Sequence, residues 1–144
     1  MFSKACEYAI KATLYVAEFS EEEKKIGLKE IAKATDSPEA YTAKILQQLT
    51  KNKILESTKG PHGGFFLDEK KLEKIKLLDI VKAVDGDEIY NGCGLGLSKC
   101  NAKKPCPVHH QFVAVRDQLK SMLSSTDLRK LTENLKAGEV YLKR

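Results

Sequence analysis

Three of the four cysteines in this 144-residue chain fall in one stretch that is rich in glycine and proline. Cys93, Cys100 and Cys106 are separated by six and by five residues. Thiolates are soft ligands suited to iron–sulfur clusters, zinc or copper(I), and glycines allow several sulfurs to converge at little steric cost. The spacing lacks the Cys-x2-Cys pairs of common zinc sites. The stretch therefore favours a metal centre, with incidental cysteines in a loop as the alternative.

Little else in the sequence points to catalysis. Cys6 lies in an amphipathic segment, where we expect it to pack as a small core residue. No phosphate-binding glycine loop and no nucleophile–base pair stands out. A redox enzyme is disfavoured because there is no Cys-x2-Cys dithiol. We therefore predict that the protein is not an enzyme.

The composition sets broad limits on the partners and the location of the protein. A formal net charge of +5 permits a nucleic-acid partner without requiring one. No apolar run approaches the ~20 residues needed to span a bilayer, and the first residues do not form a signal peptide. We expect a cytoplasmic protein with no membrane partner. There, cysteines serve in metal or redox chemistry more often than in disulfides.

The first half of the chain reads as three helices, over residues 4–19, 28–34 and 38–51. Ser3 is the expected N-cap of the first helix, and Ser37 with Pro38 is a favourable start for the third. A short helix, a tight turn and a helix with a polar outer face are typical of a helix-turn-helix. In the third helix we expect two faces. The inner one holds Tyr41, Ile45, Leu46 and Leu49, and the outer one holds Thr42, Lys44, Gln47, Gln48 and Lys51.

A hairpin follows the third helix, with strands at 54–58 and 65–67 around the glycine-rich turn 60–64. It makes the helix-turn-helix a winged helix, which predicts double-stranded DNA as the partner. Lysine and glutamine can read base edges in the major groove, and further lysines neutralise phosphates. The predicted DNA-binding residues are Tyr41, Thr42, Lys44, Gln47, Gln48, Lys51, Lys59, His62 and Gly63.

The second half of the chain contains three further predicted helices, at 77–84, 108–123 and 127–136, and a loop at 91–107. The helix at 108–123 carries an apolar stripe formed by Phe112, Val115, Leu119 and Met122. The predicted fold is mostly α with a small β-hairpin wing, a winged helix-turn-helix plus a long helix. We divide it into a winged-helix DNA-binding domain at 1–76 and a region at 77–144 that holds the cysteine loop and the long helix.

Two segments resemble the signature of the Rrf2 family of transcription regulators. They are the wing at 60–67 (GPHGGFFL) and the segment 77–86 (LLDIVKAVDG), and weaker matches extend the resemblance over about residues 3–136. The resemblance implies a homodimeric winged-helix regulator that binds a palindromic operator. It also implies that the helix at 108–123 is a long dimerisation helix, which makes residues 77–144 a cysteine-loop sensor and dimerisation region. Ala43 stands where some members carry a glutamate, so the operator preference need not be theirs.

The resemblance also implies a cofactor. Cluster-binding members carry three cysteines at about the place of Cys93, Cys100 and Cys106, and some add a histidine at the place of His109. This implies an iron–sulfur cluster on these four residues, with a two-iron cluster favoured and a four-iron cluster possible. Other members take an acidic ligand from the partner subunit's first helix, at the place of Glu7. The first spacer is one residue longer than in the histidine-bearing members, which leaves the cluster type open.

The expected function is transcriptional regulation that responds to iron–sulfur status, redox state or nitric oxide through the cysteine loop. Two alternatives remain open from the sequence. One is a cluster-free regulator controlled by a protein partner, and the other is a winged helix that contains structural zinc.

Overall fold

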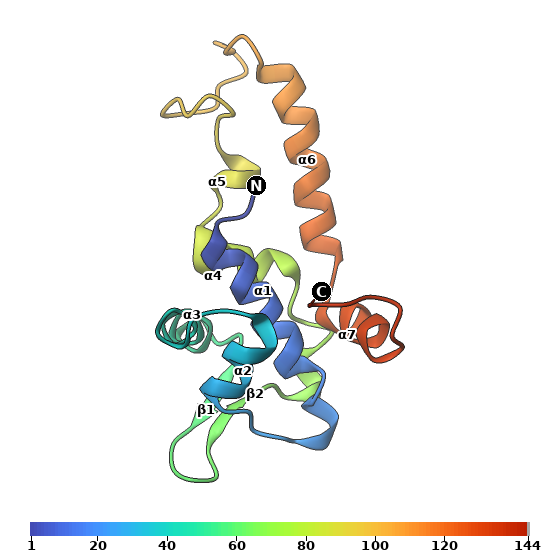
Figure 1. Cartoon of the computed structure of the whole chain (residues 1–144). Coiled ribbons are helices and arrows are strands. Elements are labelled where there is room, and N and C mark those ends of the chain that lie inside the picture. The colour runs from blue at the N-terminus through green and yellow to red at the C-terminus, as the bar shows by residue number, and fades with distance from the viewer. Residues whose placement is uncertain (144) are drawn as a thin grey trace.

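The first helix forms the centre of the fold. In the computed structural model, which describes residues 1–143, α1 spans Lys4–Ala17 and begins at Ser3, whose side chain accepts a hydrogen bond from the Cys6 backbone N–H. This confirms the predicted N-cap, although the helix ends two residues earlier than expected. Ala9, Ala12, Val16 and Ala17 are buried, and α2, α3, α4 and α7 all pack on this helix (Figure 1).

The helix-turn-helix consists of α2 (Leu28–Thr35) and α3 (Glu39–Lys51). Asp36 reverses the chain between them in the left-handed conformation, with φ of 53°. The N-cap of α3 is Pro38, one residue later than predicted, and the Ser37 side chain does not cap the helix. The predicted Ser37 cap is therefore wrong, because that hydroxyl bonds to the side chains of Thr35 and Thr42.

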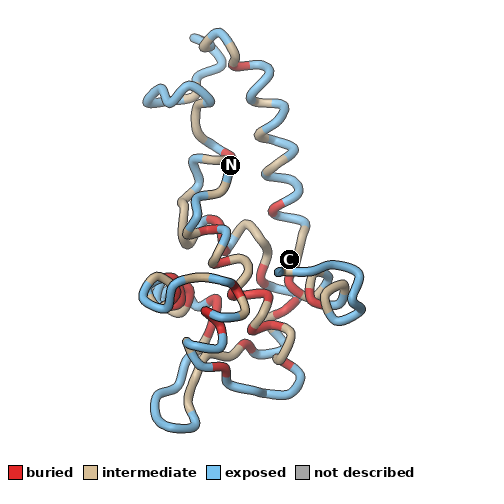
Figure 2. The backbone as a smooth tube through the Cα atoms, in the orientation of Figure 1, coloured by how far each residue is buried: buried red, intermediate tan, exposed pale blue. Residues whose placement is uncertain are grey.

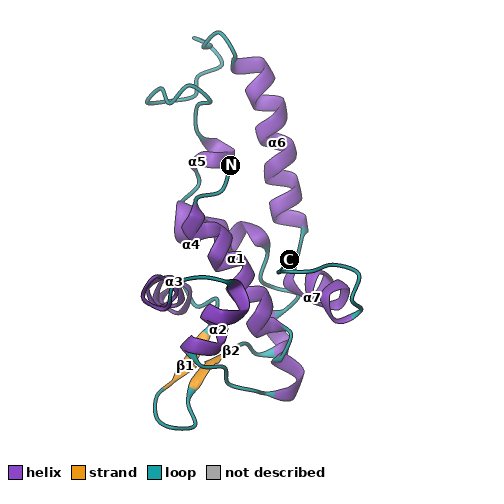
Figure 3. Cartoon of the chain, in the orientation of Figure 1, coloured by secondary structure: helices purple, strands orange, loops and turns teal. Residues whose placement is uncertain are grey.

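The wing is a two-stranded antiparallel sheet of β1 (Glu56–Thr58) and β2 (Gly64–Phe66) (Figure 3). Glu56 pairs with Phe66 and Thr58 with Gly64. Ile26 adds an isolated bridge to Phe65 through two backbone hydrogen bonds, of 2.9 and 2.8 Å. This bridge ties the wing to the segment that leads into α2.

The remaining elements are η1 (Ser20–Glu22), η2 (Glu69–Lys71), α4 (Leu77–Asp85), α5 (Glu88–Asn91), α6 (His109–Ser125) and α7 (Leu128–Lys136). The main core lies among α1, α2, α3, α4 and α7 and includes Ile31, Leu46, Ile80 and Leu128. It therefore draws on both sides of residue 76, and the division of the chain at that residue stays a prediction. Buried positions concentrate in this body, whereas α6 and the cysteine loop extend away from it (Figure 2).

The structure confirms the predicted fold class, a mostly helical winged helix followed by a long helix. Within residues 1–143, no helix combines the length and the apolar character needed to cross a bilayer.

Candidate functional site

The outer face of α3 presents hydrogen-bonding side chains to solvent. Ile45, Leu46 and Leu49 are buried against the body, which fixes how the helix is rotated. The opposite positions are exposed, as predicted, and are Lys44, Gln47, Gln48 and Lys51. A projecting helix of this kind fits the major groove of DNA.

Thr42 does not belong to this exposed face, and the prediction that it points outward is wrong. It is 1% exposed, and its hydroxyl donates to the Pro38 carbonyl at 2.9 Å. The same hydroxyl bonds to Ser37, whose Oγ lies 3.0 Å from that of Thr35. Three hydroxyls thus link the end of α2 to the first turn of α3. The sequence held the signal, because Thr42 stands three residues before Ile45 and shares its helix face.

Tyr41 and the wing tip complete the predicted DNA-facing set. Tyr41 is half-buried, as its predicted inward position suggests, and its ring lies edge-on to Tyr8 with 5.7 Å between centroids. Lys59 and His62 are exposed at the tip of the wing. At Gly63 a Cβ atom would lie only 2.2 Å from the Thr58 carbonyl oxygen, so the turn accepts no larger residue there.

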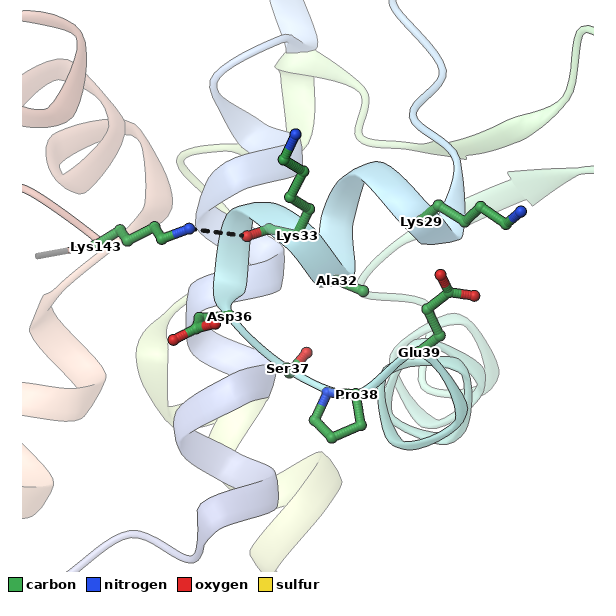
Figure 4. Close-up of a pocket in the computed structure, with 8 residues that line it drawn as sticks. All are labelled: Lys29, Ala32, Lys33, Asp36, Ser37, Pro38, Glu39 and Lys143. Atoms are coloured by element: carbon green, nitrogen blue, oxygen red, sulfur yellow. Dashed lines mark hydrogen bonds between the residues drawn. The ribbon is translucent and has the colours of Figure 1, made fainter.

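Lysines hold the C-terminal end of α2. The Lys11 ammonium donates to the Thr35 carbonyl at 3.2 Å, and Lys143 donates to the Lys33 carbonyl at 3.5 Å. Cations are favourable at this end of a helix because the helix dipole is negative there. Figure 4 shows Lys143 reaching α2 from the C-terminal segment, beside the turn that leads into α3. The end of α2, which leads into α3, is therefore held by lysines from two other segments, α1 and the C-terminal segment.

The cysteine loop brings the four predicted metal ligands together in two pairs. The Sγ atom of Cys100 lies 3.4 Å from Nδ1 of His109, and the Cys106 thiol lies near enough to Cys93 to lower the pKa of the Cys93 thiol. The pairs are connected because the His109 backbone N–H donates to the Cys106 carbonyl at 3.0 Å. Over residues 1–143, no three metal-ligating side chains gather around a common point. Binding of one shared metal centre therefore requires the two pairs to close on each other.

The surroundings of Cys93 favour its thiolate form. Nearby backbone N–H groups, that of Leu95 most and then that of Leu97, lower the pKa of its thiol, and they outweigh the opposite effect of desolvation. The Cys106 thiol and the Gly96 N–H act in the same direction. Because the thiolate is the form that binds metals, this environment suits Cys93 as a ligand.

The long helix α6 holds the start of the loop. The Phe112 ring lies on the Cα atom of Gly94, where a Cβ atom would come within 2.4 Å of the ring. Arg116 donates to the carbonyls of Asn91 and Gly92, and Lys120 donates to the Asn91 side chain at 3.2 Å. These contacts were not predicted from the sequence. Their one signal is the four-residue spacing of Phe112, Arg116 and Lys120, which places them on neighbouring parts of one helix face.

Other candidate residues lie outside these contacts. Cys6 is fully buried with Val81 and Tyr90, which confirms its predicted role in packing. Glu7, the alternative fourth ligand, is exposed and pairs with Lys4 at 2.9 Å. Its predicted role requires a partner subunit and stays a prediction.

Part of α6 presents apolar side chains to solvent. Val115 is 63% exposed, and Phe112 and Met122 are each 44% exposed. With the half-buried Leu119 they form a stripe at spacings of three and four residues, the pattern by which two helices pack side by side. We call these four residues the α6 stripe.

The winged helix, with its exposed recognition helix, defines the class of protein as a helix-turn-helix transcription regulator. Two solved structures share this fold: CymR, the global cysteine regulator of B. subtilis, with a TM-score of 0.76, and T. potens IscR, with 0.75. They are 22% and 19% identical to the chain, and the matches cover 92% and 97% of it, and 96% and 91% of those chains.

Sequence comparison then gives the family. The model of the Rrf2 family, described as an iron-dependent transcriptional regulator, matches residues 2–134. An HTH-type transcriptional regulator of Aquifex aeolicus is 32% identical, covering 91% of this chain and 90% of its own length. IscR of Photorhabdus laumondii is 29% identical, with 92% and 79% covered. The chain belongs to the Rrf2 family of transcription regulators, and it is not an enzyme.

Proposed function

We propose that this regulator binds a palindromic operator as a homodimer and that an iron–sulfur cluster in the Cys93–Cys106 loop controls its affinity for that operator. The observation that carries the proposal is the contact between Cys100 and His109 at the first residue of α6, with the thiols of Cys93 and Cys106 near each other in the same loop. The same helix carries the α6 stripe, so one element joins the metal-binding loop to the proposed dimer interface.

The DNA-binding part of the proposal relies on α3 and the wing. Gln47 and Gln48 are the side chains able to read base edges, and Lys44 and Lys51 extend the reading or bind phosphates. Lys59 and His62 at the wing tip would contact the backbone or the minor groove. Tyr41 and Gly63 would support these contacts at the edge of α3 and in the wing turn. Thr42, which is buried, would act by fixing the angle of α3.

The homodimer is supported by the α6 stripe. A helix of 17 residues is about 25 Å long, and the stripe runs from its first turn to its last. Exposed apolar residues gathered along one line mark an interaction site. A second copy offers the same stripe and can cover it symmetrically. Two recognition helices would then meet successive turns of DNA.

The donor set fits an iron–sulfur cluster. Cys93, Cys100, Cys106 and His109 would hold it, and mixed cysteine and histidine ligation of a two-iron cluster is chemically established. A four-iron cluster is the second possibility, and Glu7 of a partner subunit is the alternative to His109. The cluster would make the shape of the loop depend on iron supply, oxidation or nitric oxide. The residues of the chain would bind the cluster and orient it, and a change in the shape of the loop would be transmitted to α6.

The proposal is tested by comparing loaded and metal-free protein. Protein purified without oxygen and reconstituted with iron and sulfide should contain both, and should absorb visible light as iron–sulfur proteins do. Operator fragments selected from random DNA should then bind the two forms with different affinities at matched salt concentration. Equal affinities would remove the sensing role, and one zinc per chain without iron would favour a zinc-containing regulator.

A further inference from the structure

Arg116 has no role in the proposed ligand set, yet it makes the most direct contact with the chain entering the cysteine loop. Its Nη1 donates to the carbonyl of Asn91 at 3.3 Å and also to that of Gly92. Both carbonyls lie immediately before Cys93. A guanidinium withdrawn from water needs hydrogen-bond acceptors, and here two successive peptide groups supply them. Arg116 thus fixes how the chain enters Cys93.

Asn91 is held by other contacts as well. Its side-chain amide donates to Asp87 at 3.0 Å, and its Oδ1 accepts from Lys120 at 3.2 Å. The helix that contains it, α5, has only four residues, of which Tyr90 alone is buried. So short a helix is not stable by itself. The burial of Tyr90 and the polar contacts from α6 together keep α5 in place.

The position of Arg116 on α6 connects these contacts to the proposed metal centre. His109 is the first residue of the same helix and Cys106 lies three residues before it, whereas Cys93 stands at the far end of a long glycine-containing loop. Ordering such a loop costs conformational entropy. A hydrogen bond from α6 to the peptide before Cys93 fixes the position of Cys93 relative to Cys106 and His109 before any metal binds.

We propose that Arg116 is a positioning residue for the metal centre, which keeps the peptide before Cys93 docked on α6. The inference rests on the proposed function, since it assumes that Cys93 is a ligand. Phe112 supports the same docking one turn earlier, where its ring covers Gly94. Arg116 does not contact the metal in this proposal, and its effect passes through the backbone of Gly92.

The test compares Arg116→Ala and Arg116→Lys with wild-type protein and with Lys130→Gln, a charge-matched control at an exposed position of α7. Each is reconstituted anaerobically with iron and sulfide, and its visible absorption is followed after addition of an iron chelator. Loss of an outer contact to a metal ligand typically weakens a site by about 10- to 100-fold. We expect R116A to release iron at least about tenfold faster than wild type, R116K to lie between them, and K130Q to match wild type.

A second measurement is made on metal-free protein. Amide hydrogen exchange at residues 92–97 should be faster in R116A than in wild type, while exchange in α1 and α3 stays unchanged. If wild type binds iron and R116A releases it equally slowly, or exchange at 92–97 does not change, the positioning role is wrong and the proposed function stands. If wild type binds no iron, the proposed function fails, and the positioning role fails with it. A general loss of protection across α1 and α3 would assign Arg116 to overall stability and overturn the proposal.

Discussion

Cys100 and His109 stand with Sγ and Nδ1 3.4 Å apart, and the ring of His109 is 8% exposed. The loop returns to the first residue of α6 through this contact. An imidazole so placed is ready to join a metal centre with a thiolate that is nine residues away in sequence. Removing the imidazole should therefore change how the loop binds iron.

His109→Ala should change the metal centre, whereas Glu7→Gln should not. His109 already lies beside a proposed thiolate ligand, and Glu7 is exposed and paired with Lys4. We expect H109A, reconstituted with iron and sulfide, to show an altered absorption spectrum or a lower iron content, and E7Q to match wild type. The reverse pattern would assign the fourth ligand to the partner subunit's Glu7.

Gln47→Ala should weaken specific DNA binding because it removes a side chain able to bond to a base edge. The expected loss is about 1–3 kcal/mol at the affected base pair, with little change in non-specific binding. Lys51→Ala should weaken binding to all sequences and lower the slope of log affinity against log salt by about one. Fluorescence anisotropy at several salt concentrations checks both. If neither variant changes affinity, α3 is not the reading helix.

Thr42→Val should destabilise the fold, since it removes a buried hydroxyl that bonds to both Ser37 and the Pro38 carbonyl. Such a loss costs about 1–3 kcal/mol of unfolding free energy, which corresponds to a melting temperature lower by several degrees. Thr50→Val is the matched control, because the Thr50 hydroxyl donates to the Gln47 carbonyl at an exposed position. Equal melting temperatures for T42V and T50V would contradict the proposed role of the three linked hydroxyls.

Val115→Glu should separate the dimer. It places a charge in the most exposed part of the α6 stripe, where a second copy would exclude water. Sedimentation velocity should show a monomer for V115E and a dimer for wild type. Ser121→Glu, on an exposed part of α6 away from the stripe, should remain dimeric. A dimer that survives V115E would place the interface elsewhere.

Alkaline pH should destabilise the protein partly through Cys6. Burial, reinforced by Asp85, raises the pKa of the Cys6 thiol to about 12, from an ordinary value of 9.0. Between these values the folded protein keeps the proton and the unfolded chain releases it, so stability is intact below pH 9 and falls as pH rises toward 12. Burial and Glu30 raise the pKa of Tyr15 to about 12 as well. The melting temperature of Cys6→Ala should therefore decline less steeply with pH than that of wild type, without becoming flat.

Local patterns in the sequence were enough to predict most of the fold. The buried face of α3 follows from the spacing of Ile45, Leu46 and Leu49, and the start of α1 follows from the capping chemistry of Ser3. The predictions for Ser37 and Thr42 were wrong because a hydroxyl can cap a helix, face a DNA groove or bond to another hydroxyl. The residue type does not distinguish these roles, and only the tertiary fold decides among them.

The sequence was enough to propose a set of ligands in the cysteine loop, but not to predict how those side chains are held. Thiol and imidazole side chains reveal themselves by type and spacing. The contacts that hold them do not, because Arg116 reaches the Gly92 carbonyl 24 residues away and the bond has a backbone acceptor. Any residue can offer such an acceptor, so no pattern of residue types identifies the pair.

The wing turn has a consequence for how operator preference can change over time. Backbone crowding fixes the course of the hairpin at Gly63 and at Gly64, where φ is 148° and a Cβ atom would lie 2.8 Å from the Ile26 carbonyl oxygen. The exposed side chains at the tip take no part in this. Lys59 and His62 can therefore change during evolution, or be randomised in a library, while the backbone of the hairpin stays the same. On the proposed function, such changes would alter the contacts between the wing and the operator at little cost to folding.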